Sequence, residues 1–230
     1  MRTGVAQGVR ARTRAALTAE IKAAAKRQVA ASGAASLSLR AVARELGMVS
    51  SAVYRYYPSR DELLTALIVD AYNDVGAVAE VAAAGSAPFV GRWLAMARAI
   101  RGWARTYPHD YALVYGSPVP GYRAPEATIP AAARVAMVAL GLLEDGVVAG
   151  EVRSDGSAGL PRPVRDDLDA IRRAAAPHVP DDVLARGLGA WAQLFGTITL
   201  ELFGHMHNVI HDDDAYFDVQ MREAAARVAS

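Results

Sequence analysis

The stretch from Leu37 to Leu64 reads LSLRAVARELGMVSSAVYRYYPSRDELL. Apolar residues recur in its first part at spacings of three and four, which predicts a short helix with one buried face. These residues are Leu39, Val42, Ala43 and Leu46. Ser38 can cap the helix, because its side-chain oxygen can accept from free N–H groups of the opening turn. Gly47 stands where the helix should stop, since glycine adopts the left-handed conformation common there without penalty.

A second short helix is predicted from about Ser50 to Tyr56, with Val53 and Tyr57 as inward anchors. Valine has no capping oxygen, so Val49 leaves the capping role to Ser50 and we expect the helix to begin one residue late. Two short helices around a glycine turn have the form of a helix-turn-helix, whose second helix enters the DNA major groove.

A third helix should follow directly. Pro58 ends the second one, and Ser59 with Glu62 three residues later makes a capping-box pattern. We expect this helix to run to about Val81, long enough to act as a lever between two parts of the chain.

The whole stretch resembles the DNA-binding signature of the TetR family of transcriptional regulators. The residues that carry the resemblance are Ser38, Arg40, Val42-Ala43, Leu46-Gly47, Val53-Tyr54, Tyr56-Tyr57, Pro58-Ser59-Arg60 and Leu63-Leu64. Val42, Tyr57 and Arg60 are mild departures from the usual residues. Tyr56 replaces a usual histidine and Val49 a serine that often caps the recognition helix, which leaves the operator sequence open.

The resemblance implies that hydroxyls and Arg60 meet phosphates, while Arg40 and the first residues of the second helix meet bases. The chemistry fits, because arginine can bond guanine O6 and N7 bidentately and hydroxyls suit phosphate oxygens. The predicted DNA-contact residues are Ser38, Arg40, Ser50, Ser51, Ala52, Tyr54, Arg55, Tyr56 and Arg60.

Charge is distributed unevenly along the chain. Residues 1–62 hold 11 Lys/Arg against 4 Asp/Glu, whereas residues 63–230 hold 14 against 20. Lysine occurs only at Lys22 and Lys26. Positive charge therefore gathers in the segment with the helix-turn-helix, as phosphate binding requires. Arg2, Arg10 and Arg12 suggest a disordered basic arm over residues 1–12 that reaches DNA, or else a frayed tail.

Composition bounds the remaining possibilities. The chain has 230 residues, 53% of them apolar, and no cysteine, which excludes disulfides and thiolate metal sites. It has no secretory signal and no apolar run long enough to cross a bilayer, so we expect a cytoplasmic protein with no membrane partner.

The rest of the chain reads as helices, which makes the expected fold all-α. Two domains are expected: residues 1–60, a basic arm and three-helix helix-turn-helix domain, and residues 61–230, a larger domain for effector binding and dimerisation. The expected helices are 13–32, 89–106, a short one through Tyr115, 129–148, 164–176, Asp181 or Asp182 to about Met206, and 214–228. Loops are expected over 116–125 and 151–163.

The C-terminal part carries a second resemblance. GSPVPGYRAP (116–125) with Thr128, followed by Trp191-Ala192-Gln193-Leu194-Phe195-Gly196, is similar to the effector domain of a TetR-like subgroup named for a Trp-His-Gly pattern. The middle position here is not histidine, so the match is incomplete.

The family resemblance implies a homodimer that binds a small apolar or aromatic ligand between its helices. Candidate ligand residues are Trp93, Met96, Trp103, Tyr107, Tyr111, Tyr115, Met137 and Trp191. Candidate dimer residues are Leu184, Leu188, Phe195, Ile198 and Leu202. Both sets would also suit a helical core, and that reading stays open.

Histidines near the end of the chain raise an alternative. His205, His207 and His211 with Asp212 to Asp214 could ligate Zn or Ni, or could simply suit the ends of two helices. We predict no metal, no cofactor and no enzymatic activity, because the sequence has no Glu-x-x-His pairs, nucleophile elbow or phosphate-binding glycine loop. The favoured function is a ligand-responsive repressor. Its rivals are a ligand-independent DNA-binding protein and an all-α metal-dependent enzyme.

Overall fold

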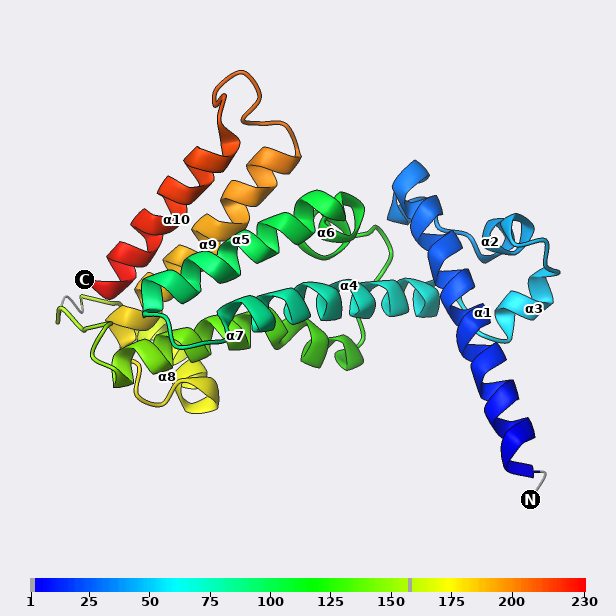
Figure 1. Ribbon diagram of the computed structural model, residues 1–230, viewed down its shortest axis with the longest axis horizontal. Coiled ribbons are helices and arrows are strands. Elements are labelled where there is room, and N and C mark those ends of the chain that lie inside the picture. Colours follow the sequence, from blue (N-terminus) through cyan, green and yellow to red (C-terminus); the bar gives the residue numbers. More distant parts are fainter. Residues whose placement is uncertain (1–2, 157–158) are drawn as a thin grey trace. The chain divides into compact units, whose positions relative to one another are not determined.

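The structure is a computed structural model that describes residues 3–156 and 159–230. Within those residues every regular element is a helix, which confirms the all-α prediction (Figure 1). The α-helices are α1 (Thr3–Ser32), α2 (Leu39–Glu45), α3 (Ser50–Tyr54), α4 (Arg60–Ala83), α5 (Phe89–Thr106), α6 (Pro108–Tyr115), α7 (Ile129–Val148), α8 (Arg162–Ala175), α9 (Asp181–Leu202) and α10 (Asp213–Ala229). Two short 3-10 turns are η1 (Ala34–Ser36) and η2 (Glu126–Thr128).

The start of the chain differs from the prediction. Helix α1 begins at Thr3, so the disordered arm expected over residues 1–12 is wrong from Thr3 onward. Adding a residue to an existing helix costs far less than nucleating one, and no proline interrupts residues 3–12. The helix can therefore extend toward the N-terminus despite Gly4 and Gly8. Residues 1 and 2, which include Arg2, lie outside the described part.

Helix α9 is shorter than expected, because it ends at Leu202 and not near Met206. Gly204 has a φ of 78°, the left-handed conformation that closes a helix. The N–H of His205 donates to the carbonyl oxygen of Leu200 at 2.9 Å, which satisfies a carbonyl of the last turn. The three histidines of the sequence analysis thus lie in the connection after α9 or directly before α10.

The chain divides into two compact units, and the first contains the helix-turn-helix. It runs from α1 through Ala71 and also includes His109–Ile129, which carries most of α6 and η2. Ile21, Ala25 and Val29 of α1 are buried and recur every four residues, which places them on one face of the helix. The other core residues of this unit include Leu39, Val42, Val53, Leu63, Leu67 and Tyr111.

Polar contacts tie the distant segment 109–129 to the helices of this first unit. Lys26 Nζ of α1 lies 2.6 Å from the carboxylate of Asp110 in α6, and Asp110 is buried. The hydroxyls of Thr65 in α4 and Tyr122 are 2.8 Å apart. A second pair joins Lys22 to Asp70 at 2.6 Å. The segment after α5 therefore belongs structurally with α1 and the start of α4.

The second unit holds Tyr72–Pro108 and Pro130–Ser230. Its core is built where α10 packs against α9 and α5 (Figure 1). The buried residues there include Trp93, Met96, Ile100 and Trp103 of α5, Leu194 and Ile198 of α9, and Phe217, Met221 and Val228 of α10.

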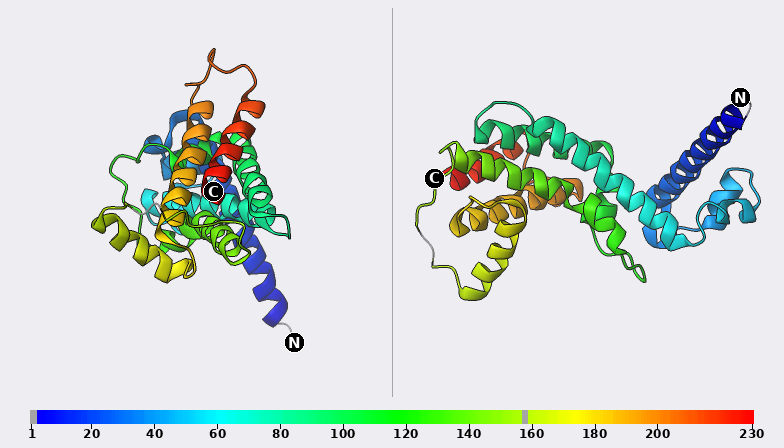
Figure 2. Two further views of the ribbon diagram at one scale, coloured as in Figure 1. Left: turned by 90° about the vertical axis from the view of Figure 1, so that its left-hand side faces the viewer. Right: turned by 90° about the horizontal axis from the view of Figure 1, so that it is seen from below.

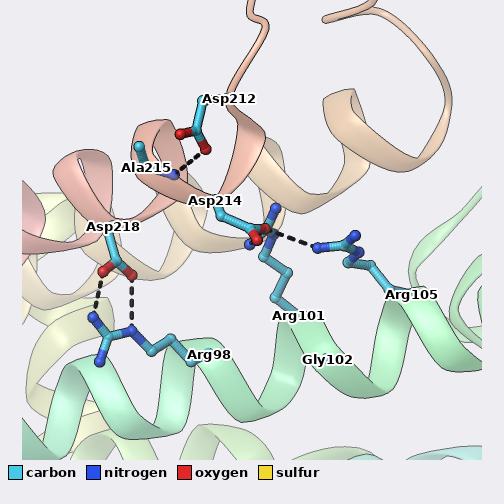
Figure 3. A pocket seen from close by; sticks show the side chains of 8 residues that line it. All are labelled: Arg98, Arg101, Gly102, Arg105, Asp212, Asp214, Ala215 and Asp218. Atoms are coloured by element: carbon cyan, nitrogen blue, oxygen red, sulfur yellow. Dashed lines mark hydrogen bonds and ion pairs between the residues drawn. The ribbon is translucent and has the colours of Figure 1, made fainter.

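An ion-pair network crosses the same three helices, and Figure 3 shows its contacts between α5 and α10. Arg101 of α5 is buried and donates two hydrogen bonds to the Glu201 carboxylate of α9, at 2.7 and 2.9 Å. It also lies 2.8 Å from Asp214 of α10. Arg98 donates to both oxygens of Asp218, which lowers the pKa of that carboxyl because the hydrogen bonds favour the ionised form.

No helix among the described residues is long and apolar enough to cross a membrane.

Candidate functional site

The turn between α2 and α3 is built by the residues that predicted it. The N–H of Ala41 donates to the Ser38 hydroxyl at 3.5 Å, which confirms the cap of α2. Gly47 has a φ of 65°, and the N–H of Met48 donates to the carbonyl oxygen of Ala43 at 2.8 Å. This six-residue closure with a left-handed glycine is a Schellman motif, and it turns the chain sharply toward α3.

Helix α3 begins at Ser50 without the one-residue delay expected from Val49, and it ends at Tyr54, two residues before the predicted end. Val49 is in the capping position and there is no side-chain cap, so the expected capping role of Ser50 is wrong. Val49 has extended backbone angles, and its carbonyl oxygen accepts from the N–H of Ala52 at 2.9 Å. A capping residue needs those backbone angles more than it needs a side-chain acceptor, since water can satisfy exposed N–H groups.

One face of α3 is buried and the other is free. Val53 is fully buried and anchors the helix, whereas Ser51, Tyr54 and Arg55 are exposed. Ser50 and Ala52 are partly exposed. Residues of α3 therefore reach solvent on the side away from the core, where a groove of DNA could receive them.

Exposed arginines occur on the helices that build this motif. Arg40 on α2 is exposed, and no carboxylate in the described part of the chain pairs with it or with Arg55. Arg14 of α1 places its guanidinium carbon 5.2 Å from the centre of the Tyr56 ring, a cation–π distance. Arg14 was not among the residues predicted from sequence, since only the folded chain brings it beside Tyr56.

Arg60 and Tyr57 have structural partners. Arg60 donates to the carbonyl oxygens of Ala34 and Ala35 at 3.0 and 3.2 Å, and it pairs with Asp61 at 3.1 Å. Tyr57 is half-buried, and burial raises the pKa of its hydroxyl, with the Asp70 charge as a second cause. Tyr57 is thus a packing residue, as the sequence suggested.

The eight predicted ligand residues are divided between the two units. Tyr111 and Tyr115 belong to the first unit and the other six to the second. Trp93, Met96 and Trp103 are buried in the α5 core, and Tyr107 and Met137 are exposed. The indole N–H groups of Trp93 and Trp103 have no hydrogen-bond partner among the described residues.

Trp191 alone among the eight lines an apolar groove of the second unit. The groove has a volume of about 290 Å³ and lies between α7, α8 and α9. Its lining is formed by Ala136, Ala139, Leu140, Leu143, Ile171, Leu184, Gly187, Leu188 and Trp191. Gly187 gives Leu143 the room it occupies, because a Cβ at Gly187 would lie 2.6 Å from Leu143 Cδ1.

The five predicted dimer residues also separate. Leu184 and Ile198 are buried within the subunit itself and have no surface left for a partner. Leu188 is exposed and lines the groove, while Phe195 and Leu202 are half-buried. The exposed side of α9 is a different stripe, made of Gly189, Ala192, Gly196 and Leu200. On α10 the exposed apolar residues are Ala215, Val219 and Ala226.

The described residues include no cluster of metal-binding side chains. Within residues 3–156 and 159–230, no group of three or more His, Asp or Glu side chains is arranged to hold a metal ion.

Two short helices joined by a left-handed glycine, with an exposed second helix and unpaired arginines in the same motif, define a helix-turn-helix DNA-binding protein. Comparison with known proteins gives the family. Residues 21–67 match the model for bacterial regulatory proteins of the tetR family, and residues 93–224 match the tetracyclin repressor-like C-terminal domain.

Relatives that match almost the whole chain are also named as regulators. The HTH-type transcriptional regulator Rv1816 of Mycobacterium tuberculosis is 41% identical over 228 residues, which cover 96% of each chain. The solved structure of SCO4313 is 36% identical, with a TM-score of 0.76, and the match covers 93% of this chain and 97% of that one. A tetR-family regulatory protein from Rhodococcus RHA1 is 18% identical with a TM-score of 0.64, over 92% and 96% of the two chains, and shares the fold. The chain therefore belongs to the TetR family and is a DNA-binding transcriptional regulator.

Proposed function

We propose that this regulator is a homodimeric repressor that a small apolar or aromatic ligand releases from a palindromic operator. The observation that supports DNA binding is the exposed face of α3, together with the exposed and unpaired guanidinium of Arg40 on α2. We assign residues 1–60 to DNA contact and residues 61–230 to effector binding and dimerisation. The segments GSPVPGYRAP and Trp191 to Gly196 support the Trp-His-Gly subgroup, and the site of action is the cytoplasm.

The proposed contacts divide by chemistry. Arg40, Ser50, Ser51, Ala52 and Arg55 are the base and groove contacts. Ser38, Tyr54 and Tyr56 meet phosphates. Arg60 was predicted to meet a phosphate too, but two of its nitrogens already bond within the chain. We therefore give Arg60 the role of fixing η1 against the start of α4.

Selection of bound DNA from a random pool tests the operator directly. A palindrome with half-sites about 34–36 Å apart is expected, because two recognition helices of a dimer enter successive major grooves on one side of the duplex. Recovery of single, unpaired half-sites would contradict dimeric binding, and recovery of no preferred sequence would contradict specific recognition.

Arg40→Ala is expected to weaken operator binding by roughly 1–3 kcal/mol and to relax discrimination at one base pair per half-site. The reason is the loss of a bidentate arginine–guanine contact, which carries sequence information that a phosphate contact lacks. Titration against the operator and against its single-base variants measures both effects. Arg165→Ala, which removes an exposed arginine of α8, is the charge control. Equal affinity of Arg40→Ala and wild type would remove Arg40 from the base contacts.

The exposed stripes of α9 and α10 support pairing of two subunits. Small residues on α9 let backbones approach closely, and Val219 on α10 is a large apolar side chain left 50% exposed. A four-helix seam built from both copies would cover these residues. Leu188 belongs to the groove and is left out of the proposed seam.

Val219→Asp is expected to convert the dimer to a monomer and to weaken operator binding as a consequence. An unpaired carboxylate buried in an apolar interface costs several kcal/mol. Sedimentation measures the mass of the protein in solution. Val148→Asp, at a valine of α7 that is 69% exposed, is the matched control and should remain dimeric. A Val219→Asp protein that stays dimeric would exclude this seam.

The apolar groove is the proposed effector site. Its lining is almost wholly apolar and it includes Trp191, which fits a small aliphatic or aromatic molecule. Ligand would favour a conformer whose two recognition helices no longer match successive grooves. Helix α4 is continuous from the helix-turn-helix into the second unit, and the Lys26–Asp110 and Thr65–Tyr122 contacts hold the segment after α5 to the first. These connections are the proposed route of the change.

A melting screen against small apolar and aromatic compounds is expected to find a stabiliser. At a concentration 100 times its Kd, a ligand of the native state adds about 2.7 kcal/mol, which raises the melting temperature by roughly 5–10 °C. Ala139→Phe, which fills the groove, should remove the shift without changing DNA affinity. A shift that persists in Ala139→Phe would place the effector elsewhere. A screen with no stabiliser would favour the ligand-independent regulator.

A further inference from the structure

The first turns of α1, from Thr3 to Arg14, project beyond α2 and α3 (Figures 1 and 2). We call these residues the N-terminal extension. Arg12 to Ala16 are all exposed, and these five residues make more than one helical turn, so the helix buries no face against the chain over that turn. A helix that is solvated on all sides gains nothing from packing and is marginal by itself. Binding to a partner outside the chain would stabilise the helical form of this extension.

The charge of the extension restricts what that partner can be. Residues 3–19 contain three arginines, Arg10, Arg12 and Arg14, and no Asp or Glu. No carboxylate in the described part of the chain pairs with Arg12 or Arg14. A one-signed helix of this kind attracts a polyanion, and it is continuous with the unit that carries the recognition helix.

Arg14 connects the extension to the recognition face. Its guanidinium carbon lies 5.2 Å from the centre of the Tyr56 ring, and Tyr56 follows α3 by two residues. The ring holds the guanidinium by cation–π attraction while leaving its N–H groups free to donate. The guanidinium is therefore held beside a residue that is itself proposed to meet a phosphate.

We propose that the N-terminal extension of α1 is a second DNA-binding surface, which grips the backbone of the duplex flanking each half-site. Arg12 and Arg14 bind phosphates there, and Tyr56 positions Arg14. The proposal rests on the operator binding proposed above and extends its footprint. The dozen residues from Thr3 to Arg14 rise about 18 Å along a helix. That length corresponds to about five base-pair steps of 3.4 Å.

The salt dependence of binding tests the phosphate contacts. Each phosphate contact contributes about 0.9 to the slope of log K against log salt concentration. The double variant Arg12→Ala/Arg14→Ala should therefore lower the slope by about 2 per subunit and weaken binding by roughly tenfold or more at 0.1 M salt. Arg162→Ala/Arg165→Ala, which removes two exposed arginines of α8, is the matched control for lost charge and should leave the slope unchanged. Melting curves confirm that the exposed substitutions leave the fold intact.

Two kinds of duplex separate failure of this proposal from failure of the proposed function. On operator DNA, trimming ten flanking base pairs should weaken the wild type but not the double variant. On random-sequence duplex the slopes should still differ, because phosphate contacts ignore sequence. Equal slopes for wild type and double variant on both duplexes would overturn the proposal and leave operator recognition untouched. A wild type that prefers no sequence, yet keeps the slope difference, would overturn specific recognition alone.

A double-mutant cycle tests the positioning role of Tyr56. Arg14→Ala alone should weaken binding by roughly threefold to tenfold. In a Tyr56→Leu background, which removes the aromatic face, the same substitution should cost less than twofold, because Arg14 has already lost its support. The same factor in both backgrounds would show that Arg14 does not depend on Tyr56.

Discussion

Ser51→Glu is expected to abolish operator binding while the protein stays folded and dimeric. Ser51 is exposed on the free face of α3, so a longer side chain meets no core atom. In the proposed complex the new carboxylate enters a groove lined by phosphates, and like-charge contact at an interface costs several kcal/mol. A loss of about 3 kcal/mol already weakens binding more than 100-fold.

Titration of operator DNA measures the effect, and a melting curve verifies the fold. Ser117→Glu is the matched control, since it adds the same charge at an exposed serine in the loop after α6. It should reduce affinity only slightly, through the change in net charge. If Ser51→Glu and Ser117→Glu bound the operator equally well, α3 would not be the recognition helix.

Arg101→Met is expected to destabilise the second unit by roughly 3–5 kcal/mol. The side chain of Arg101 is 9% exposed and that of Glu201 is 14% exposed, and the two share two hydrogen bonds. Removing the arginine leaves the Glu201 carboxylate partly desolvated without its main partner. It also removes a guanidinium that lies 4.8 Å from the centre of the Phe217 ring. Denaturant unfolding measures the loss.

Two further variants make this prediction specific. Arg105→Met removes an arginine whose side chain is 53% exposed and whose partner Asp214 is 75% exposed, so its cost should stay within about 1 kcal/mol. The double variant Arg101→Met/Glu201→Met should recover part of the stability, because no buried charge is then left unpaired. Equal losses for Arg101→Met and Arg105→Met would contradict the importance of burial.

The helix-turn-helix could be predicted from sequence because its signals are local. Ser38 caps α2 and Gly47 closes it within a few residues of the chain, and Val53 is the buried anchor of α3. The prediction failed where the local signal was weak. At Val49 the backbone conformation set the helix start without a capping side chain, and before Thr13 helix propagation outweighed the glycines.

The dimer interface and the effector residues could not be predicted from sequence, because both depend on how the helices pack together. Helix α9 is apolar on most sides, so three-four spacing could not separate Leu184 and Ile198, which fill the core, from Gly196 and Leu200, which face solvent. The Arg101–Glu201 pair joins residues far apart in sequence, and the periodicity of apolar residues does not predict such a contact. The predicted ligand residues were aromatic and amphipathic, a property that core and pocket residues share.

The two lysines carry a practical consequence for labelling. Lys22 and Lys26 are the only lysine side chains of the chain, and both are held in ion pairs, with Asp70 and Asp110. Amine-reactive dyes, acetylating reagents and amine-coupled sensor chips would therefore modify the contacts that bind α1 to α4 and α6. Because the chain has no cysteine, one introduced thiol can carry a fluorophore or spin label at a chosen position. Distance measurements between two such probes, one on each copy, can then follow the recognition helices with both lysines intact.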